Sequence, residues 1–95
     1  MNYHFPKIFK TPSSNGFPVY LLRDGKLYRT AFHPEGWSEH PDYRFENDGK
    51  FYRTEYHKLG FGLCSDYEFG RDRKIYRTKS HPDGKADMPD YEIRD

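Results

Sequence analysis

The chain has 95 residues, which suits a single domain, and its 16 basic and 15 acidic side chains leave a net charge of +1. This balance removes the usual electrostatic argument for a nucleic-acid or membrane partner, although a local basic row can exist within a neutral total. The single cysteine excludes an intramolecular disulfide and favours a reducing compartment. Because no apolar run is long enough for a secretory signal or a membrane span, we expect a cytoplasmic protein with no membrane partner.

The composition predicts a core built largely from aromatic side chains. Aliphatic residues are few, but the chain has nine Tyr, eight Phe and one Trp. Each buried ring removes about 150–250 Å² from water, so a small number of rings can fill a small core. The low net charge argues against disorder, because disordered chains of this polarity usually carry a strong charge excess. We therefore expect a folded protein with a thin core.

Residues 1–17 differ from the rest of the chain and read as an N-terminal arm. Tyr3, Phe5, Ile8 and Phe9 fit one short strand, and residues 11–16 have the composition of a loop. The remaining residues, 18–95, form a tandem repeat.

A Lys-apolar-Tyr-Arg-Thr run occurs at residues 26–30, 50–54 and 74–78, and therefore recurs at one fixed spacing. An Asp stands two positions before each Lys, and a His stands three positions after each Thr. The repeat units are 18–41, 42–65 and 66–89, followed by a partial unit, 90–95. Gly and Pro interrupt β-forming segments at short, regular intervals, so each unit reads as strand, turn, strand and long loop. The fold class is all-β, an antiparallel meander of three β-hairpin repeats.

The turn of each hairpin decides which side chains share a face of the sheet. Arg73 is a poor residue for positive φ, which favours a three-residue loop with one left-handed position over a two-residue turn with two. This register pairs Leu21 with Leu27, Phe45 with Phe51 and Phe69 with Ile75. The inner face would also hold Val19, Tyr43 and Tyr67, with Arg29, Arg53 and Arg77 at its margin. First-strand residues expected to face outward are Tyr20, Arg44, Glu68 and Glu92.

The two ends of the chain suggest a closing hairpin. The partial unit that contains Tyr91 and Ile93 is a first strand without a second, and Tyr3–Lys10 stands where a second strand would stand. We expect the two segments to pair and close the sheet into a small barrel-like shape. The alternative is an open sheet that buries one face by dimerising, so the sequence leaves monomer and homodimer open.

Repeated outward-facing side chains form the first candidate binding surface. A row of Tyr rings is typical of stacking platforms for bases or sugars, and flanking Lys and Thr side chains can bind phosphates or hydroxyl groups. The alternative is that Tyr and Thr are simply good strand residues. The positions are Lys26, Tyr28, Thr30, Lys50, Tyr52, Thr54, Lys74, Tyr76 and Thr78.

The repeated Arg and His residues have both structural and functional interpretations. The Arg row could bind an anionic polymer, or its guanidinium groups could cover Tyr rings and pair with Asp42, Asp66 and Asp90. His33, His57 and His81 converge only if the hairpins close into a tight ring. A His that leads into a Pro-x-Gly turn, as His33 and His81 do, more often bonds the loop backbone. No His or Cys pair has the short spacing of a structural zinc site, so neither a metal nor another cofactor is predicted.

The loops vary most between units, and variation on a repeated frame is where recognition often resides. Trp37, Phe61 and Leu63 could anchor a partner protein or fold back over an end of the sheet. Cys64 has no unrepeated His partner, and a threefold repeated residue set suits an asymmetric catalytic site poorly, so we do not expect an enzyme. The favoured function is a non-enzymatic module that binds a protein partner through its variable loops. The alternative is a binder of an extended polymer, nucleic acid or glycan, through the Lys-Tyr-Thr rows.

In length and aromatic character the repeat is similar to choline-binding cell-wall repeats and to membrane-occupation-and-recognition repeats. Leu27-Tyr28-Arg29 stands where the first family has Trp-Tyr-Tyr, and the Gly-x-Gly strand signature of the second is absent. No site residue is therefore transferred from either family.

Overall fold

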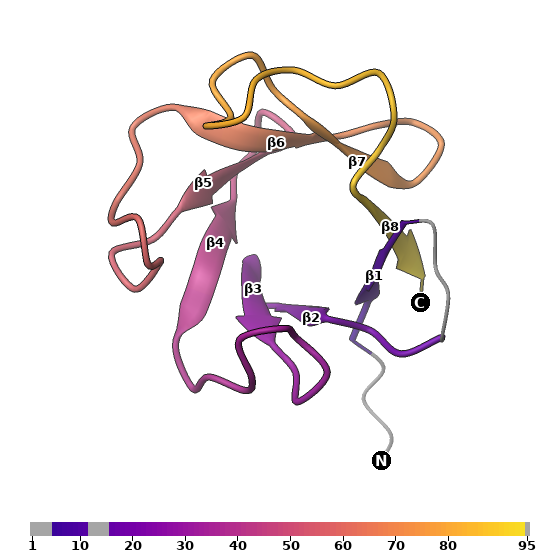
Figure 1. Cartoon of the computed structure of the whole chain (residues 1–95), viewed down its shortest axis with the longest axis vertical. Coiled ribbons are helices and arrows are strands. Elements are labelled where there is room, and N and C mark those ends of the chain that lie inside the picture. Colours follow the sequence, from indigo (N-terminus) through magenta and orange to yellow (C-terminus); the bar gives the residue numbers. More distant parts are fainter. Residues whose placement is uncertain (1–4, 12–15, 95) are drawn as a thin grey trace.

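The structure, a computed structural model, describes residues 5–11 and 16–94. Eight antiparallel strands form a closed barrel in which each strand pairs with its neighbours in chain order (Figure 1). The strands are β1 (Lys7–Lys10), β2 (Tyr20–Arg23), β3 (Lys26–Arg29), β4 (Pro41–Phe45), β5 (Lys50–Arg53), β6 (Ser65–Phe69), β7 (Lys74–Arg77) and β8 (Tyr91–Arg94). The expected all-β meander is confirmed. Within the described ranges, no helix has the length and apolar character needed to cross a membrane.

The barrel is closed by the first and last strands, β1 and β8, which lie side by side in Figure 1. Strand β1 pairs with β8, where Ile8 lies opposite Ile93 and Lys10 opposite Tyr91. On its other side β1 pairs with β2. The expected fourth hairpin is therefore confirmed, and the chain does not form the alternative open sheet. Tyr3 of the expected terminal strand lies outside the described residues.

The second and third hairpins have the expected three-residue turns. Phe45 lies opposite Phe51, and Phe69 lies opposite Ile75. Each turn has its left-handed residue immediately before the second strand, Gly49 with φ of 76° and Arg73 with φ of 64°. The register predicted from the poor fit of Arg73 to a two-residue turn is confirmed for these units.

The first hairpin differs, and the predicted pairing of Leu21 with Leu27 is wrong. Leu22 lies opposite Leu27, across a two-residue turn in which Asp24 and Gly25 both have positive φ, 53° and 74°. The first unit is shorter by a single position, so Tyr20 and Tyr43 are closer together in the sequence than Tyr43 and Tyr67. Tyr20 is therefore inside the barrel, 4% exposed, and not on the outer face as expected.

Two layers of side chains fill the barrel. One contains the tyrosines at the start of the first strands, and the other is mainly aliphatic, with the buried ring of Phe51 and the partly buried ring of Phe45. Ile8, Phe51 and Ile75 are at most 1% exposed, and burying side chains of this size stabilises the fold by about 1.5–3 kcal/mol each. Phe69, expected inside, is 38% exposed at the edge of this layer. The tyrosine layer marks the end of the barrel where the long loops begin.

Candidate functional site

Four tyrosines form a closed ring across one end of the barrel. Neighbouring ring centroids are 6.2 Å apart for Tyr20 and Tyr43, 5.7 Å for Tyr43 and Tyr67, 5.5 Å for Tyr67 and Tyr91, and 5.9 Å for Tyr91 and Tyr20. The interplanar angles of 72–79° make every contact edge-to-face, the favoured geometry for aromatic pairs. Each tyrosine comes from the first strand of a hairpin, so the fourfold ring follows directly from the repeat.

Three Arg–Asp ion pairs lie beside the tyrosine ring, as the structural interpretation of the Arg row suggested. Each pair joins the second strand of one hairpin to the first strand of the next or, for Asp90, to the residue immediately before that strand. The Nε–Oδ2 distances are 3.0 Å for Arg29–Asp42, 3.5 Å for Arg53–Asp66 and 2.8 Å for Arg77–Asp90. Two tyrosines add to these pairs: Tyr20 donates to Asp42 at 3.2 Å, and Tyr67 donates to Asp90 at 3.3 Å.

The three repeated histidines each bond both the loop backbone and a tyrosine. Nδ1 accepts a hydrogen bond from the backbone N–H two positions later, at 3.0 Å in all three units. Nε2 lies 3.1 Å from the Tyr20 hydroxyl in His33, 3.1 Å from Tyr43 in His57 and 3.2 Å from Tyr67 in His81. Because Nδ1 is an acceptor, the neutral ring carries its proton on Nε2 and donates it to tyrosine. The expected bond from His to the loop backbone is confirmed.

Burial keeps these groups uncharged near neutral pH. It lowers the pKa of His33, His57 and His81, because a protonated imidazole is poorly solvated there. Burial also raises the pKa of the Tyr20 and Tyr67 hydroxyls far above the ordinary value. A protonated His would in addition point its Nδ1–H at the backbone N–H that it now binds. The loops are thus fastened to the tyrosine ring by neutral histidines.

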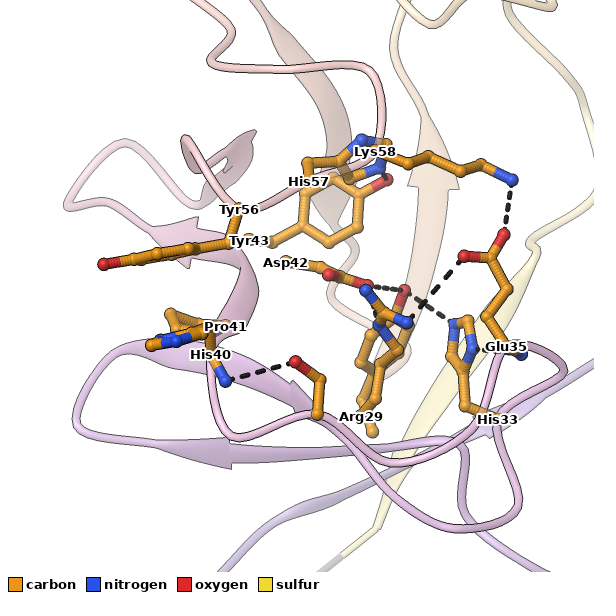
Figure 2. Close-up of polar contacts among 12 residues, drawn as sticks. Arg29, His33, Glu35, His40, Pro41, Asp42, Tyr43, Tyr56, His57 and Lys58 are labelled. Atoms are coloured by element: carbon orange, nitrogen blue, oxygen red, sulfur yellow. Dashed lines mark hydrogen bonds and ion pairs between the residues drawn. The ribbon is translucent and has the colours of Figure 1, made fainter.

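A cavity of about 550 Å³ opens at this end of the barrel. The tyrosines form its floor, and histidines and Arg–Asp pairs form its walls; we call this the barrel mouth. Figure 2 shows one side of it, where Glu35 lies between Lys58, at 2.5 Å, and Arg29, at 3.8 Å. Exposed groups at the rim include Lys10, Leu59 and Asp83.

One sector of the mouth departs from the fourfold pattern. A sector here is the second strand of one hairpin with the first strand of the next. Three sectors each contribute an Arg–Asp pair, whereas the sector of β1 and β2 has Lys10 in place of the Arg and Val19 in place of the Asp. The Lys10 ammonium nitrogen lies 5.2 Å from the centroid of the Tyr91 ring. Among the described residues, no histidine bonds the Tyr91 hydroxyl. The mouth is therefore asymmetric despite the repeat.

The predicted Lys-Tyr rows lie on the outside of the barrel, where the tyrosines bond their own hairpins. The Tyr52 hydroxyl donates to Asp48 at 2.5 Å, and the Tyr76 hydroxyl donates to Asp72 at the same distance. These bonds raise the pKa of both tyrosines and lower the pKa of both aspartates. Tyr28 instead has the Arg23 guanidinium 4.2 Å from its ring centroid. Lys26 is exposed, whereas Lys50 and Lys74 are half-buried.

The predicted placement of the Thr rows on the outer face is wrong for two of the three positions. Thr54 and Thr78 are buried, at 8% and 7% exposure, and Thr30 is half-buried. Each hydroxyl donates to a backbone carbonyl in the first strand of its own hairpin or just before that strand. The bonds are Thr30 to Pro18, Thr54 to Pro41 and Thr78 to Ser65. The threonines tie the start of each long loop to the barrel and leave the Lys-Tyr surface without its third member.

The variable loop residues do not cover the end of the barrel. Trp37 is 68% exposed, Phe61 57% and Leu63 85%. The loop that carries Phe61 is nevertheless fastened to the strands, because Arg44 donates to the carbonyls of Arg53, at 2.6 Å, and Gly62, at 3.2 Å. The Arg44 guanidinium also lies 4.5 Å from the Phe61 ring centroid. Trp37 and Phe61 therefore stand on the surface as the docking interpretation requires.

Sequence reasoning assigned the barrel mouth no function, although it identified most of its repeated residues. The missing element was Tyr20, which joins the ring only if the first unit is shorter by a single position. The recurrence of Pro-x-Tyr at residues 18–20, 41–43 and 89–91 is the signal that aligns it correctly. Comparison with models of protein families, with curated proteins and with solved structures finds no match for this chain.

Proposed function

We propose that this barrel is a non-enzymatic interaction module that binds a protein partner through the variable parts of its long loops. The observation that carries the proposal is the exposure of large apolar side chains in these parts: Trp37, Phe61, Leu63 and Met88 are 57–85% exposed. Aromatic and Met side chains are enriched in protein interfaces, and Trp is prominent among the residues that dominate binding energy. The partner surface would be apolar, with pockets for these side chains.

The loops are held in place before any partner binds. Each begins with a turn that His fastens to the tyrosine ring, and a Thr hydroxyl bonds the adjacent strand. Arg44 connects the second loop to the barrel at Gly62 and Phe61. Such preorganisation lowers the conformational entropy cost of association.

Two other functions, polymer binding by the Lys-Tyr rows and catalysis in the barrel mouth, receive less support from the geometry. The repeated hydrogen bonds of the Lys-Tyr rows connect each tyrosine to its own turn, so fewer polar groups remain for a nucleic acid or glycan chain. The ionisable groups of the barrel mouth are largely paired with one another, which favours a structural role for them over acid–base catalysis. We therefore retain the loop surface as the functional surface.

A photo-crosslinking experiment tests the proposal. A photoreactive phenylalanine analogue at position 37 or 61 should capture one partner, and the same analogue at position 28 or 52 should not. The purified partner should then shift the fluorescence of Trp37, the single tryptophan, to shorter wavelength. Trp37→Ala and Leu63→Ala should weaken binding by roughly tenfold or more, as expected for interface anchors.

Tyr28→Ala is the matched control, since it removes an aromatic ring from the outside of the barrel. Its binding should equal that of the wild type. If Tyr28→Ala or Lys50→Ala weakens binding, and the loop variants do not, the partner occupies the Lys-Tyr rows and the proposal fails. A steep dependence on salt would then favour a polyanion.

A further inference from the structure

We infer that the barrel mouth is a second binding site, which takes a neutral, polyhydroxylated small molecule of the size of one or two saccharide rings. This inference does not depend on the proposed function of the loops, because the mouth is built from a different set of residues. Four features carry it: the volume of the cavity, the cancellation of charge, the density of hydrogen-bonding groups and the aromatic floor.

The cavity has a suitable volume and position. Its 550 Å³ fall within the range of about 300–1,000 Å³ that is usual for small-molecule sites, which are often found at the open ends of β-barrels. The floor is rigid, because the tyrosine rings contact one another and the hydroxyls of Tyr20, Tyr43 and Tyr67 bond histidines. A ligand would thus meet a preformed surface.

Most charges of the mouth are paired with a charge of opposite sign, which favours a ligand without net charge. Arg29 pairs with Asp42, and Arg77 pairs with Asp90. Glu35 lies between Lys58 and Arg29 and is similarly neutralised. An anion or a cation would approach groups of both signs at similar distances, so neither gains a strong net attraction.

The same ion pairs supply donors and acceptors for a ligand's hydroxyl groups. In the pairs of Arg29 and Arg77 the hydrogen bond to Asp uses the Nε–H, which is one of five guanidinium donors. Lys10 and Asp83 at the rim add a cationic donor and an acceptor from different parts of the chain. Hydroxyl groups both donate and accept, and a saccharide presents several of them around one ring, so it can bond both members of a pair.

The aromatic side chains provide a surface on which a ligand ring can pack, and the sector of Lys10 and Val19, which differs from the other three, can fix the ligand's orientation. Saccharide rings have apolar C–H surfaces that pack on aromatic side chains. The half-buried histidine rings of the mouth offer such surfaces above the tyrosine floor, whose rings are largely buried. Val19 makes the sector of Lys10 and Val19 less polar than the other three. The Tyr91 hydroxyl there shares a hydrogen bond with the neighbouring Tyr67 but has no histidine partner among the described residues. We therefore place the Tyr91 hydroxyl among the ligand's contacts.

An amide-resolved NMR titration with a set of probes tests this inference. Glucose, galactose, N-acetylglucosamine, maltose and cellobiose are the neutral probes, and glucosamine and glucuronate are their charged counterparts. We expect at least one neutral probe to shift amides around His33, His57 and His81 with millimolar or better affinity, unchanged by added salt. Amides of Trp37 and Leu63 should not shift, which separates this site from the loop surface.

Variants then locate the site. Tyr91→Phe should weaken binding by roughly 3- to 10-fold, the loss expected for one hydrogen bond. It also removes the bond between Tyr67 and Tyr91, but all three His–Tyr bonds remain. Tyr52→Phe is the matched control, because it removes a hydroxyl outside the barrel, and it should leave the affinity unchanged. Leu59→Trp should weaken binding more strongly, because it narrows the rim of the cavity at a position that is 56% exposed.

Two results would overturn the inference. One is the absence of shifts at the mouth with every neutral probe at concentrations up to tens of millimolar, where even weak saccharide binding is visible. The other is binding of glucosamine or glucuronate alone, with an affinity that falls as salt is added, which would assign the mouth to a charged ligand.

Discussion

Ile8 lies directly opposite Ile93, so residues near the two ends of the chain face each other across the strand pair that closes the barrel. Both side chains belong to the core, with exposures of 0% and 7%. The stability of the whole barrel therefore depends on the N-terminal arm, although this arm has the least repetitive sequence. Without β1, the edges of β2 and β8 would be left unpaired.

Ile8→Ala is expected to destabilise the protein by about 2–5 kcal/mol, the usual cost of truncating a fully buried isoleucine. Urea denaturation measures this loss. Leu63→Ala, at an 85% exposed position, is the control and should change stability by less than about 0.5 kcal/mol. Equal stabilities for the two variants, or rapid amide exchange in both β1 and β8 of the wild type, would contradict the closure.

The sequence was sufficient to predict the strands, the terminal hairpin and the three-residue turns of the second and third units, because a repeated pattern gives several copies of the same local signal. Phe45 and Phe51 pair as expected for this reason. It was insufficient for Tyr20, because the assumption of a strictly constant spacing hides a deletion in one turn. A shift in register by a single position moves every side chain of a strand to the other face.

The barrel mouth could be anticipated only in part. The Arg–Asp pairs and the His–backbone bonds depend on local spacing, which the repeat displays. The convergence of His33, His57 and His81 on one cavity depends on the radius and closure of the barrel, which are properties of the whole sheet. For the same reason the burial of Thr54 was missed: its partner, the carbonyl of Pro41, belongs to the preceding strand.

Thr54→Val is expected to cost about 1–3 kcal/mol, because it keeps the shape of the side chain and removes a buried hydroxyl that bonds two backbone groups. These are the carbonyl of Pro41, which accepts, and the N–H of Tyr56, which donates at 3.2 Å. Thr54→Ser keeps the hydroxyl and should cost less. Chemical denaturation of both variants checks the difference. If Thr54→Ser is as destabilising as Thr54→Val, the packing of the Thr54 methyl group contributes as much as its hydroxyl, and the predicted dominance of the hydrogen bonds is wrong.

Gly49→Ala is expected to destabilise the second hairpin by about 1–2 kcal/mol, because its φ of 76° is unfavourable for a residue with a side chain. A Cβ at this position would meet no atom within 4 Å, so the cost is conformational and not steric. Gly49→Asn should cost less, since Asn adopts left-handed conformations more readily. Thermal unfolding of the two variants provides the test, and a larger loss with Asn than with Ala would contradict it.

Stability is expected to fall as the pH decreases below about 6.5, the pKa of histidine in the unfolded chain. Burial lowers the native pKa of His33, His57 and His81, so below this pH the unfolded chain binds more protons than the native one. Nearby arginines oppose protonation further, whereas Asp42, Asp66 and Asp90 favour it, and the burial effect is the largest. The stabilising contribution is therefore complete above the unfolded pKa and is lost as pH falls toward the native values.

Denaturation midpoints measured between about pH 7.5 and about pH 5 check this direction, ahead of the range in which carboxylates titrate. His57→Asn keeps a side-chain acceptor for the N–H of Leu59 and removes one of the three titrating groups. The loss of stability between these pH values should therefore be smaller than in the wild type by roughly a third. His40→Asn is the control, because His40 stacks on Tyr56 outside the mouth, with ring centroids 4.1 Å apart, and it should keep the wild-type slope. A slope that is the same in His57→Asn as in the wild type would show that the histidines of the mouth do not set the acid sensitivity.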